Sequence, residues 1–404
     1  MNLGKALVMV AVDQLSVSKD AVASLEEQLA AAKDHRIVRS QRGWELLRYE
    51  DCLWALRAPE LMRAKLFIWR ADNIDLPHGT VAREFIETTL NAQEGDMRKH
   101  LRVPVAKLLA PRSIKRLEDD VHMIVHRALD EVKDPDNVDF MEEVCWRIPS
   151  ETYCAMTSIP YEYAPEIARL SDSSLGPLLT MEKDRVPEML QAYEDTFAFV
   201  HKYFDERRQN LGDDFTSALI EMQIAGELTM DELYNLGVNF LQASVDNTVH
   251  ESSLVIAKLL ERPESWKMLL DNPSLKPHAV EEVMRMWPRF RTHIRYAAHD
   301  MELFGEQIAK DDLVFEHVVA SHYDESVFPD PMTFDITRPL NPGPLIFGQG
   351  QYSCLGQHLA RLEMHELLQA MMDRFPNARL LEFEEHEGPF IRHTTKMRVS
   401  LTGR

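Results

Sequence analysis

Cysteine is scarce in this chain, with four residues among 404. Their spacing gives neither a C-x-x-C motif nor close pairs, which argues against a disulfide framework and indicates a reducing compartment. The cysteines are Cys52, Cys145, Cys154 and Cys354. Long apolar runs are also missing: the stretch nearest the start, residues 6–12, is far too short to span a bilayer, and no small-residue cleavage site follows it. We therefore expect a soluble, cytoplasmic protein.

Basic residues are outnumbered, and glycine is sparse. The chain has 45 Lys and Arg against 66 Asp and Glu, and this net charge of −21 argues against nucleic acid or an anionic membrane as a partner. Only 15 glycines are present, and no linker, low-complexity segment or repeat interrupts the chain. An apolar fraction of 45% is ample for a large core, so we expect one mainly helical domain over residues 1–404.

Apolar spacing predicts two helices and a hairpin near the start of the chain. These elements are an amphipathic helix at 19–33, a hairpin of strands at 37–38 and 44–47, and a helix at 49–57. Residues 61–93 have no consistent period and contain Pro77-His78-Gly79.

Two later helices carry clear start and stop signals. A capping box from Thr229 to Glu232 opens a helix that stays apolar on most sides up to Pro263. Such a helix is long enough to cross the molecule, which predicts a central, buried position. Another helix begins at Lys276-Pro277, where proline suits the first turn, and stops before Pro288.

The most distinctive stretch is residues 347–361, F-G-Q-G-Q-Y-S-C-L-G-Q-H-L-A-R. Three glycines bracket Cys354, and an apolar repeat at helical spacing runs from Leu355 to Phe375, where Pro376 stops it. Glycines permit unusual φ angles and let the backbone approach a flat ligand closely. The loop therefore delivers a thiol to the start of a buried helix.

The position of Cys354 predicts a thiolate that ligates a metal. The first amides of a helix have no internal partner, and the helix dipole there favours negative charge. An anionic sulfur beside open backbone suits the axial position of a haem iron. The alternative is a buried structural cysteine that follows a glycine turn.

These fifteen residues resemble the haem-ligand loop of the cytochrome P450 family, F-x-x-G-x-x-x-C-x-G-x-x-L-A-R. The matching positions are Phe347, Gly350, Cys354, Gly356, Leu359, Ala360 and Arg361. The family usually has a basic residue two positions before the cysteine, where this chain has Tyr352. The resemblance implies the family's fold: a large helical body with small β-sheets, in which haem b lies between a long central helix and the cysteine helix.

The resemblance extends over roughly residues 36–404. The first 35 residues are atypical, because they lack the proline-rich segment common in soluble members. The loop residues implied to surround the haem are Phe347, Gly348, Tyr352, Gly356 and Ala360, with Cys354 as the iron ligand.

A basic helix face is the second part of the resemblance. Arg98 and Arg102 lie four residues apart and share one face, where the family holds a haem propionate, and arginine suits bidentate carboxylate binding. Arg295, in T-H-I-R-Y-A, matches the family's second propionate-binding arginine. For the first pair the alternative is a solvated basic face. Pro104 is expected to kink or shorten this helix.

The same region is a basic island in an acidic chain. An acidic electron donor of the ferredoxin or flavodoxin type is expected to dock there. The residues of this island are Lys99, Lys107, Arg112, Lys115 and Arg116.

The middle of the expected central helix reads A-S-V-D-N-T at residues 243–248. The family motif there is a small residue, glycine, any residue, an acid and usually threonine, so Ala243 and Asp246 match while Ser244 and Asn247 depart. A buried Asp beside an Asn is costly unless it is hydrogen-bonded or functional. The resemblance implies that Asp246 and Asn247 handle protons during oxygen activation; the alternative is a structural polar network.

The pair Glu282 and Arg285 forms an E-x-x-R motif whose ends can meet on one helix face. Alone the motif is weak, since any surface helix can contain it. It stands about seventy residues before the cysteine, as the family requires. There the family has a buried triad with a later arginine, here Arg338, and the triad fixes the side of the molecule that carries the cysteine loop.

Several side chains are candidates to contact substrate. By resemblance, the aperiodic segment caps the pocket, the central helix faces it, and segments beside Arg295 and near the C-terminus form its walls. The candidates are Phe67, Ile68, Trp69, Phe85, Asn239, Phe240, Ser244, Thr292, His293, Ile294, Phe390 and Ile391. For His293, a surface or internally hydrogen-bonded histidine is the alternative.

The sequence thus predicts a bacterial-type haem-thiolate monooxygenase. Such an enzyme inserts one oxygen atom from O2 into a small or medium apolar substrate, by hydroxylation or O-dealkylation, with electrons from NAD(P)H through a ferredoxin and reductase. Two alternatives stay open. One is a peroxide-dependent or non-oxygenating enzyme, because position 247 lacks the usual alcohol, and the other is a non-catalytic haem-binding protein.

Overall fold

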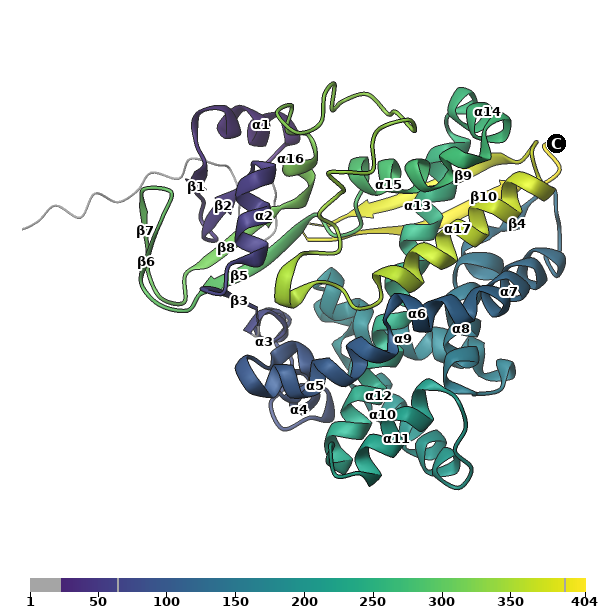
Figure 1. The fold of residues 1–404 in the computed structure, drawn as a ribbon, viewed down its shortest axis with the longest axis horizontal. Coiled ribbons are helices and arrows are strands. Elements are labelled where there is room, and N and C mark those ends of the chain that lie inside the picture. Colours follow the sequence, from purple (N-terminus) through teal and green to yellow (C-terminus); the bar gives the residue numbers. More distant parts are fainter. Residues whose placement is uncertain (1–22, 64, 389) are drawn as a thin grey trace, which may run out of the picture.

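The computed structural model describes residues 23–63, 65–388 and 390–404 (Figure 1). The part rich in strands lies at one end of the molecule, beside a larger helical body (Figure 1). The predicted apolar run at 6–12 and the first four residues of the helix predicted at 19–33 lie outside the described residues. The rest of that helix is confirmed, and it begins after Ser24, whose side chain accepts a hydrogen bond from the Glu27 amide.

The helical elements alternate between long helices and short turns. The helices before residue 210 are α1 (Leu25–Asp34), α2 (Tyr49–Arg57), α3 (Lys65–Asn73), α4 (Val81–Thr88), α5 (Gly95–Leu108), α6 (Pro111–Ile114), α7 (Glu118–Asp130), α8 (Arg147–Thr157), α9 (Ala164–Thr180) and α10 (Val186–Arg208). The later helices are α11 (Phe215–Ile224), α12 (Met230–Ser244), α13 (Asp246–Leu260), α14 (Pro263–Asp271), α15 (Lys276–Met286), α16 (Val318–His322) and α17 (Gln357–Arg374). Short helical turns are η1 (Leu90–Ala92), η2 (Lys115–Leu117), η3 (Met141–Cys145), η4 (Tyr161–Tyr163), η5 (Lys183–Arg185), η6 (Pro273–Leu275) and η7 (Gly350–Tyr352).

The described strands form three small sheets. Their orders are β1-β2-β8-β5-β3, β4-β10-β9 and β6-β7. The strands are β1 (Ile37–Arg39), β2 (Trp44–Leu46), β3 (Leu61–Met62), β4 (Val138–Asp139), β5 (Thr292–Ala297), β6 (Met301–Leu303), β7 (Glu306–Ile308), β8 (Leu313–His317), β9 (Arg379–Glu387) and β10 (Arg392–Ser400). The predicted hairpin is confirmed, since Ile37 pairs with Leu46 across antiparallel β1 and β2.

The central helix differs from the prediction, because it is two helices. The capping box at Thr229 is present as expected, but α12 ends at Ser244 and α13 begins at Asp246. Val245 between them has φ −104° and ψ −72°, away from regular helical geometry. The Ser244 hydroxyl donates to the carbonyl of Phe240, 2.7 Å away, and such a bond to the preceding turn bends helices.

The structure adds detail in two stretches. Residues 61–93, which showed no period, contain β3, α3, α4 and η1, and Thr80 caps α4 by accepting from the Arg83 amide. These elements are short, so a few apolar positions are too few to display a period. Pro104 does not shorten its helix, since α5 continues to Leu108.

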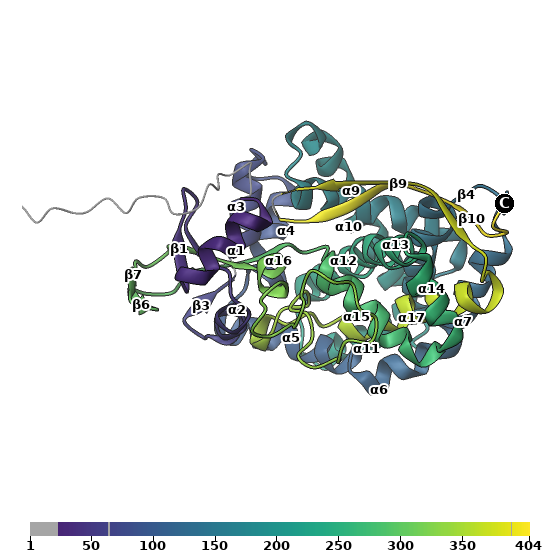
Figure 2. The same cartoon turned by 90° about the horizontal axis from the view of Figure 1, so that it is seen from above.

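The helix α13 lies in the middle of the helical body and packs against α17, α15 and β10. Figure 2 shows the long β9–β10 hairpin running along the side of this central region. Most side chains of α13 are buried, from Thr248 through Leu260. None of the described helices combines the length and apolarity required to cross a membrane.

Candidate active site

The cysteine loop is held by its own backbone and by α2. The Cys354 amide donates to the Phe347 carbonyl at 2.8 Å, which closes the loop on itself. Gly350 has φ +66°, and a Cβ there would stand 3.1 Å from the carbonyl oxygen of Leu56. A residue with a side chain would therefore be strained and would push the loop away from α2.

Cys354 lies just before α17, whose N-cap is Gly356. Its side chain is accessible, whereas the side chains of the other three cysteines are buried. None of the four cysteines forms a disulfide. Desolvation by the surrounding protein raises the pKa of the Cys354 thiol, although the Gly356 amide and the charge of Arg63 favour the thiolate. A bound cation such as iron would favour the thiolate that the helix N-terminus predicts.

A group of arginines surrounds Tyr352, the residue two positions before the cysteine. The guanidinium carbons of Arg98 and Arg295 lie 4.6 and 4.9 Å from the Tyr352 ring centroid. The Tyr352 hydroxyl donates to the carboxylate of Glu94. Tyr352 thus connects two arginines where the family usually has a further cation.

Two more arginines complete this group. Arg102 donates to the Ser353 carbonyl at 2.6 Å, beside the cysteine. Arg63, which the sequence did not single out, has its pKa lowered to about 9, first by desolvation and then by the charges of Arg295 and Arg98. It follows the two-residue strand β3 in the aperiodic segment, so no local signal identified it.

The arginine group needs anions that the described chain does not supply. The buried Nε atoms of Arg98 and Arg295 have no hydrogen-bond partner among the described residues. Crowded, partly desolvated guanidinium groups are costly unless they bind anions such as carboxylates. The two propionates of a haem fit this requirement, and they would lie beside the accessible Cys354 sulfur.

Across from the loop, α12 presents a face with small and polar side chains. Ala243 is exposed, and Asn239 and Asn247 are partly exposed at helical spacing from it. Phe240 lies on another face, because its ring stacks on Phe215 with centroids 3.7 Å apart. This ring contact directs Phe240 toward α11, and a contact of Phe240 with substrate stays a prediction. The Ser244 hydroxyl is occupied by its own helix.

Asp246 opens α13 and is 1% exposed. It forms an ion pair with Arg289, and the Nε of Arg289 also donates to Asn247 Oδ1 at 3.2 Å. His250 Nε2 lies 3.5 Å from the Asp246 carboxylate. Burial would raise the pKa of Asp246, but Arg289 and His250 more than offset it and hold that pKa well below its usual range. Asp246 is thus ionised and firmly oriented.

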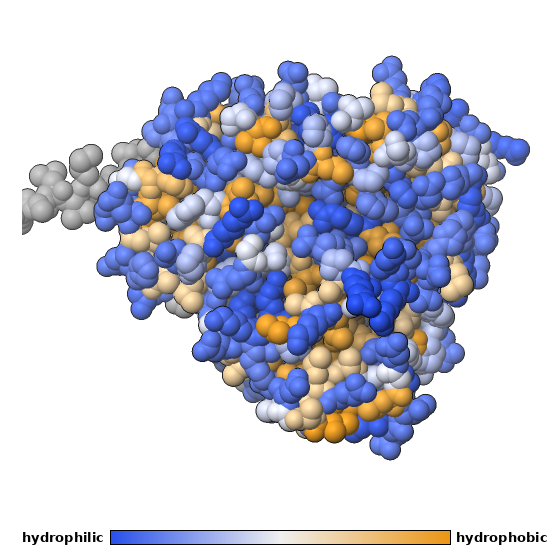
Figure 3. Space-filling view, in the orientation of Figure 1, coloured by the Kyte–Doolittle hydropathy of each residue, from blue (hydrophilic) through white to orange (hydrophobic). Residues whose placement is uncertain are grey.

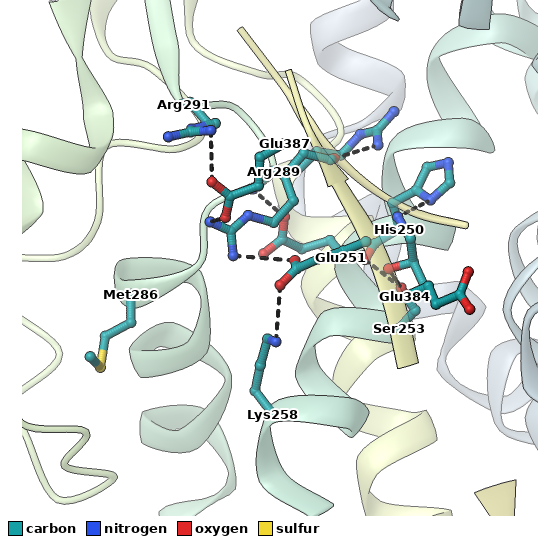
Figure 4. A network of polar contacts seen from close by, with 12 residues as sticks. His250, Glu251, Ser253, Lys258, Met286, Arg289, Arg291, Glu384 and Glu387 are labelled. Atoms are coloured by element: carbon teal, nitrogen blue, oxygen red, sulfur yellow. Dashed lines mark hydrogen bonds and ion pairs between the residues drawn. The ribbon is translucent and has the colours of Figure 1, made fainter. Parts of the chain in front are cut away.

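Figure 4 shows how Arg289 and His250 lie among charged residues of α13 and the β9–β10 hairpin. The Arg289 backbone amide donates to Glu251 at 3.2 Å, and burial raises the pKa of Glu251 to about 7. On the far side of Asp246, an open cavity of about 730 Å³ reaches the surface between α9, α8 and β10. Its polar lining includes Asp172, Asp246, His250 and His393. The distal acid is therefore adjacent to solvent-accessible space.

The E-x-x-R pair is buried as expected. Arg285 donates to both carboxylate oxygens of Glu282, at 2.7 and 2.8 Å, and both side chains are almost fully enclosed. Arg338 Nε adds a third contact to Glu282 at 3.2 Å. The three residues thus form one network between α15 and the loop that follows α16.

The substrate candidates separate into two sets. One set gathers in an apolar cluster of α3, α9, β5 and the segment before β10; from the candidates it contains Phe67, Trp69, Ile294, Phe390 and Ile391. The others lie elsewhere: Phe85 packs against Tyr193 and Phe197 on α10, and Ile68 packs against the main core.

Two neighbouring candidates on β5 are also placed apart from this cluster. The His293 Nε2 is 2.9 Å from the Leu345 carbonyl. This side chain therefore contacts the segment that leads into the cysteine loop. Thr292 is buried, and its hydroxyl has no partner among the described residues. His293 is therefore the internally hydrogen-bonded histidine that the sequence left as an alternative.

An accessible cysteine in a glycine-rich loop, with partly desolvated arginines beside it, has the features of a haem-thiolate protein. The comparisons agree. The family model for Cytochrome P450 matches residues 170–389. The chain is 31% identical over 296 residues to 6-deoxyerythronolide B hydroxylase of Saccharopolyspora erythraea, covering 73% of this chain and 72% of the relative. It is 30% identical over 340 residues to luteothin monooxygenase of Streptomyces thioluteus, covering 84% and 83%.

A solved structure of epothilone D-bound cytochrome P450epoK superposes with a TM-score of 0.83 at 23% identity, over 93% of this chain and 95% of that one. This likeness shows the fold. The chain belongs to the cytochrome P450 family, and it is a monooxygenase of the bacterial type. The family carries a haem whose iron is bound by a cysteine thiolate.

Proposed function

We propose that this enzyme inserts one oxygen atom from O2 into a small or medium apolar molecule, by hydroxylation or O-dealkylation. The observation that carries the proposal is the accessible Cys354 beside the arginine group. An apolar wall with few polar groups suits an apolar substrate. When bound, the haem supplies the oxygen chemistry, and the protein supplies binding, orientation and proton handling.

The cofactor in this proposal is haem b, with Cys354 as the axial ligand. Ala243 leaves room on the distal side. Arg98, Arg102 and Arg295 bind the propionates together with Arg63, and Tyr352 orients two of them through its ring. The proximal residues that pack around the ligand are Phe347, Gly348, Gly356 and Ala360.

Asp246 and Asn247 are the proposed proton-handling residues. Asp246 is ionised by its ion pair with Arg289 and is adjacent to the open cavity, from which a proton can reach its carboxylate. Asn247 is bound to the same arginine through its amide oxygen. An amide can hold a water or a substrate oxygen by hydrogen bonds, although it passes protons less readily than a hydroxyl.

The electron donor is proposed to be a ferredoxin or flavodoxin-type protein supplied by an NAD(P)H-dependent reductase. All five residues of the basic island are exposed, on or between α5, α6 and η2, and α6 packs against the cysteine helix α17. Figure 3 shows hydrophilic surface over this part of the molecule. Since all four cysteines are free, we place the reaction in a reducing cytoplasm.

The experiment that tests the proposal starts with an absorbance screen of candidate substrates against the haem-loaded protein. A molecule that shifts the spin state is then incubated with NAD(P)H, a ferredoxin and its reductase, and the product is analysed for one atom of 18O from 18O2. Incorporation of one labelled atom is expected. Product without label would overturn the monooxygenase assignment for that substrate.

A second candidate function is a peroxide-dependent or non-oxygenating reaction of the same haem. The observation that favours it is Asn247, because its side chain is committed to Arg289 and offers no hydroxyl where the family usually has threonine. Turnover with hydrogen peroxide alone that exceeds reductase-driven turnover would support this candidate. The reverse ratio supports the monooxygenase.

A further inference from the structure

Arg70 is a buried cation without a counterion. It lies on α3 with 3% of its surface exposed. Its Nε and Nη1 atoms are enclosed and have no hydrogen-bond partner among the residues that the structure describes. The nearest aromatic contact is Phe390, whose ring centroid lies 5.2 Å from the guanidinium carbon. Such a cation–π contact offsets only part of what the burial of an unpaired charge costs.

Two other buried arginines of this protein, Arg83 and Arg285, differ from Arg70. Arg83 binds two carboxylates, those of Asp72 and Glu87, and Arg285 binds Glu282. Desolvation lowers the pKa of Arg70 to about 10, with no acidic group acting against it. The residues that the structure describes therefore supply Arg70 with no anion.

The position of Arg70 indicates which kind of molecule would supply an anion. Two neighbours on α3, Phe67 and Trp69, belong to the apolar cluster, and the Trp69 ring meets Phe390 edge-on with centroids 5.7 Å apart. The Arg70 guanidinium lies over the face of the same Phe390 ring. A charged group thus stands at the border of the apolar cluster that the proposed function assigns to substrate.

We propose that Arg70 binds the carboxylate of an otherwise apolar substrate, and this inference rests on the proposed function for the location of the substrate. A planar guanidinium with several free donors suits bidentate binding of a carboxylate. The apolar cluster then receives the hydrocarbon part of the same molecule. The substrate class is an amphiphilic carboxylic acid, oriented by its charged end.

The haem propionates are carboxylates too, but other arginines account for them. Arg63, Arg98, Arg102 and Arg295 gather around Tyr352 and Cys354, and this makes four cations for two propionates. The arginines acting on the Cys354 thiol are Arg63, Arg102 and Arg361. Arg70 instead lies against Phe390, and within this group its charge acts on Arg63.

The test compares acids with their uncharged esters in titrations of the haem-loaded full chain. The probes are dodecanoate and 4-phenylbutanoate, each beside its methyl ester, and binding is measured by calorimetry and by the spin-state shift. Wild type is expected to bind at least one acid about tenfold or more tightly than its ester. In Arg70→Gln that preference should disappear, with the acid weakened about 10- to 100-fold and the ester within about threefold.

Two further variants make the result specific. Arg70→Lys keeps a charge and should recover part of the acid preference. Arg83→Gln, on α4, removes a buried arginine that already has protein partners and should leave the acid-to-ester ratio unchanged. The haem content of Arg70→Gln should equal that of wild type.

Four outcomes would overturn the proposal. They are an unchanged acid-to-ester ratio in Arg70→Gln, no acid preference in wild type, no binding of either acid, and loss of haem from Arg70→Gln, which would make Arg70 a propionate ligand. The titrations measure binding and need no turnover, so a failed oxygenation assay does not affect the test of Arg70. Conversely, a failed binding test does not affect the spectral evidence for a haem-thiolate protein.

Discussion

Asp246 and Arg289 form an ion pair in the interior, although 43 residues separate them in the chain. The pair connects the first turn of α13 to the segment between α15 and β5. It also engages Asn247, so one arginine orients both residues proposed to handle protons. The geometry of the distal side thus depends on a residue outside the central helix.

Asp246→Asn tests the role of this carboxylate while preserving its size. We expect product formation per enzyme to fall about 100-fold, because an amide cannot accept and return a proton. The measurement is NAD(P)H consumed against product formed, with a thermal unfolding scan to separate catalysis from stability. Asp172→Asn, in the same cavity and paired with Arg185, is the matched control and should keep near-normal turnover. Wild-type turnover in Asp246→Asn would show that the acid is structural.

Cys354→Ala should abolish the red-shifted Soret band of the reduced protein with carbon monoxide. That band reports thiolate ligation, and Cys354 is the accessible cysteine. Cys154→Ala, which removes a buried thiol on α8, should retain it. A persistent band in Cys354→Ala would contradict the assignment of the ligand.

Glu282→Ala should lower the free energy of unfolding by roughly 3–5 kcal/mol, since it leaves Arg285 buried without its carboxylate. Urea unfolding and haem content after purification are the measurements. The control is Asp271→Asn, which breaks an exposed ion pair with Lys267 on α14. Its free energy of unfolding should equal that of wild type. Equal stability of the two variants would mean that the buried triad does not support the fold.

The buried Glu363 of α17 should make stability fall as pH rises. Desolvation raises its pKa from 4.5 to about 8 in the folded protein, against weaker opposing effects of Thr152 and Thr248. Between these values the folded state holds a proton that the unfolded chain has released. Glu363 therefore lowers the free energy of unfolding by roughly 1.4 kcal/mol for each pH unit of increase across that window.

Glu363→Gln removes this contribution. Its free energy of unfolding should match wild type near pH 4 and exceed it increasingly up to pH 8. The control is Glu366→Gln on the same helix, whose carboxylate contacts His122 near the surface. Parallel pH profiles for wild type and Glu363→Gln would disprove the shifted ionisation.

The parts of the fold that the sequence predicted are those encoded locally. The capping box at Thr229, the hairpin around Gly43 and the cysteine loop each depend on neighbours within a few residues. The buried E-x-x-R pair was foreseeable for the same reason, and its partner Arg338 required the family pattern.

What the sequence missed depends on contacts between distant segments. Arg63 and Arg70 lie in a stretch of short elements, and their importance comes from residues far along the chain. Arg289 is unremarkable in sequence until it meets Asp246. Phe240 illustrates the limit of sequence patterns: nothing in the sequence indicates that its ring stacks on Phe215 of α11.

The break at Val245 divides the central helix into two parts that pack against different helices. The half before it, α12, packs mainly against α9 and α10, whereas α13 packs mainly against α17 and α15. Ala243 therefore lies on the helix held by α9 and α10, and Asp246 lies on the helix held by α17 and α15. The two sides of Val245 have different packing partners, although both residues belong to the same predicted motif.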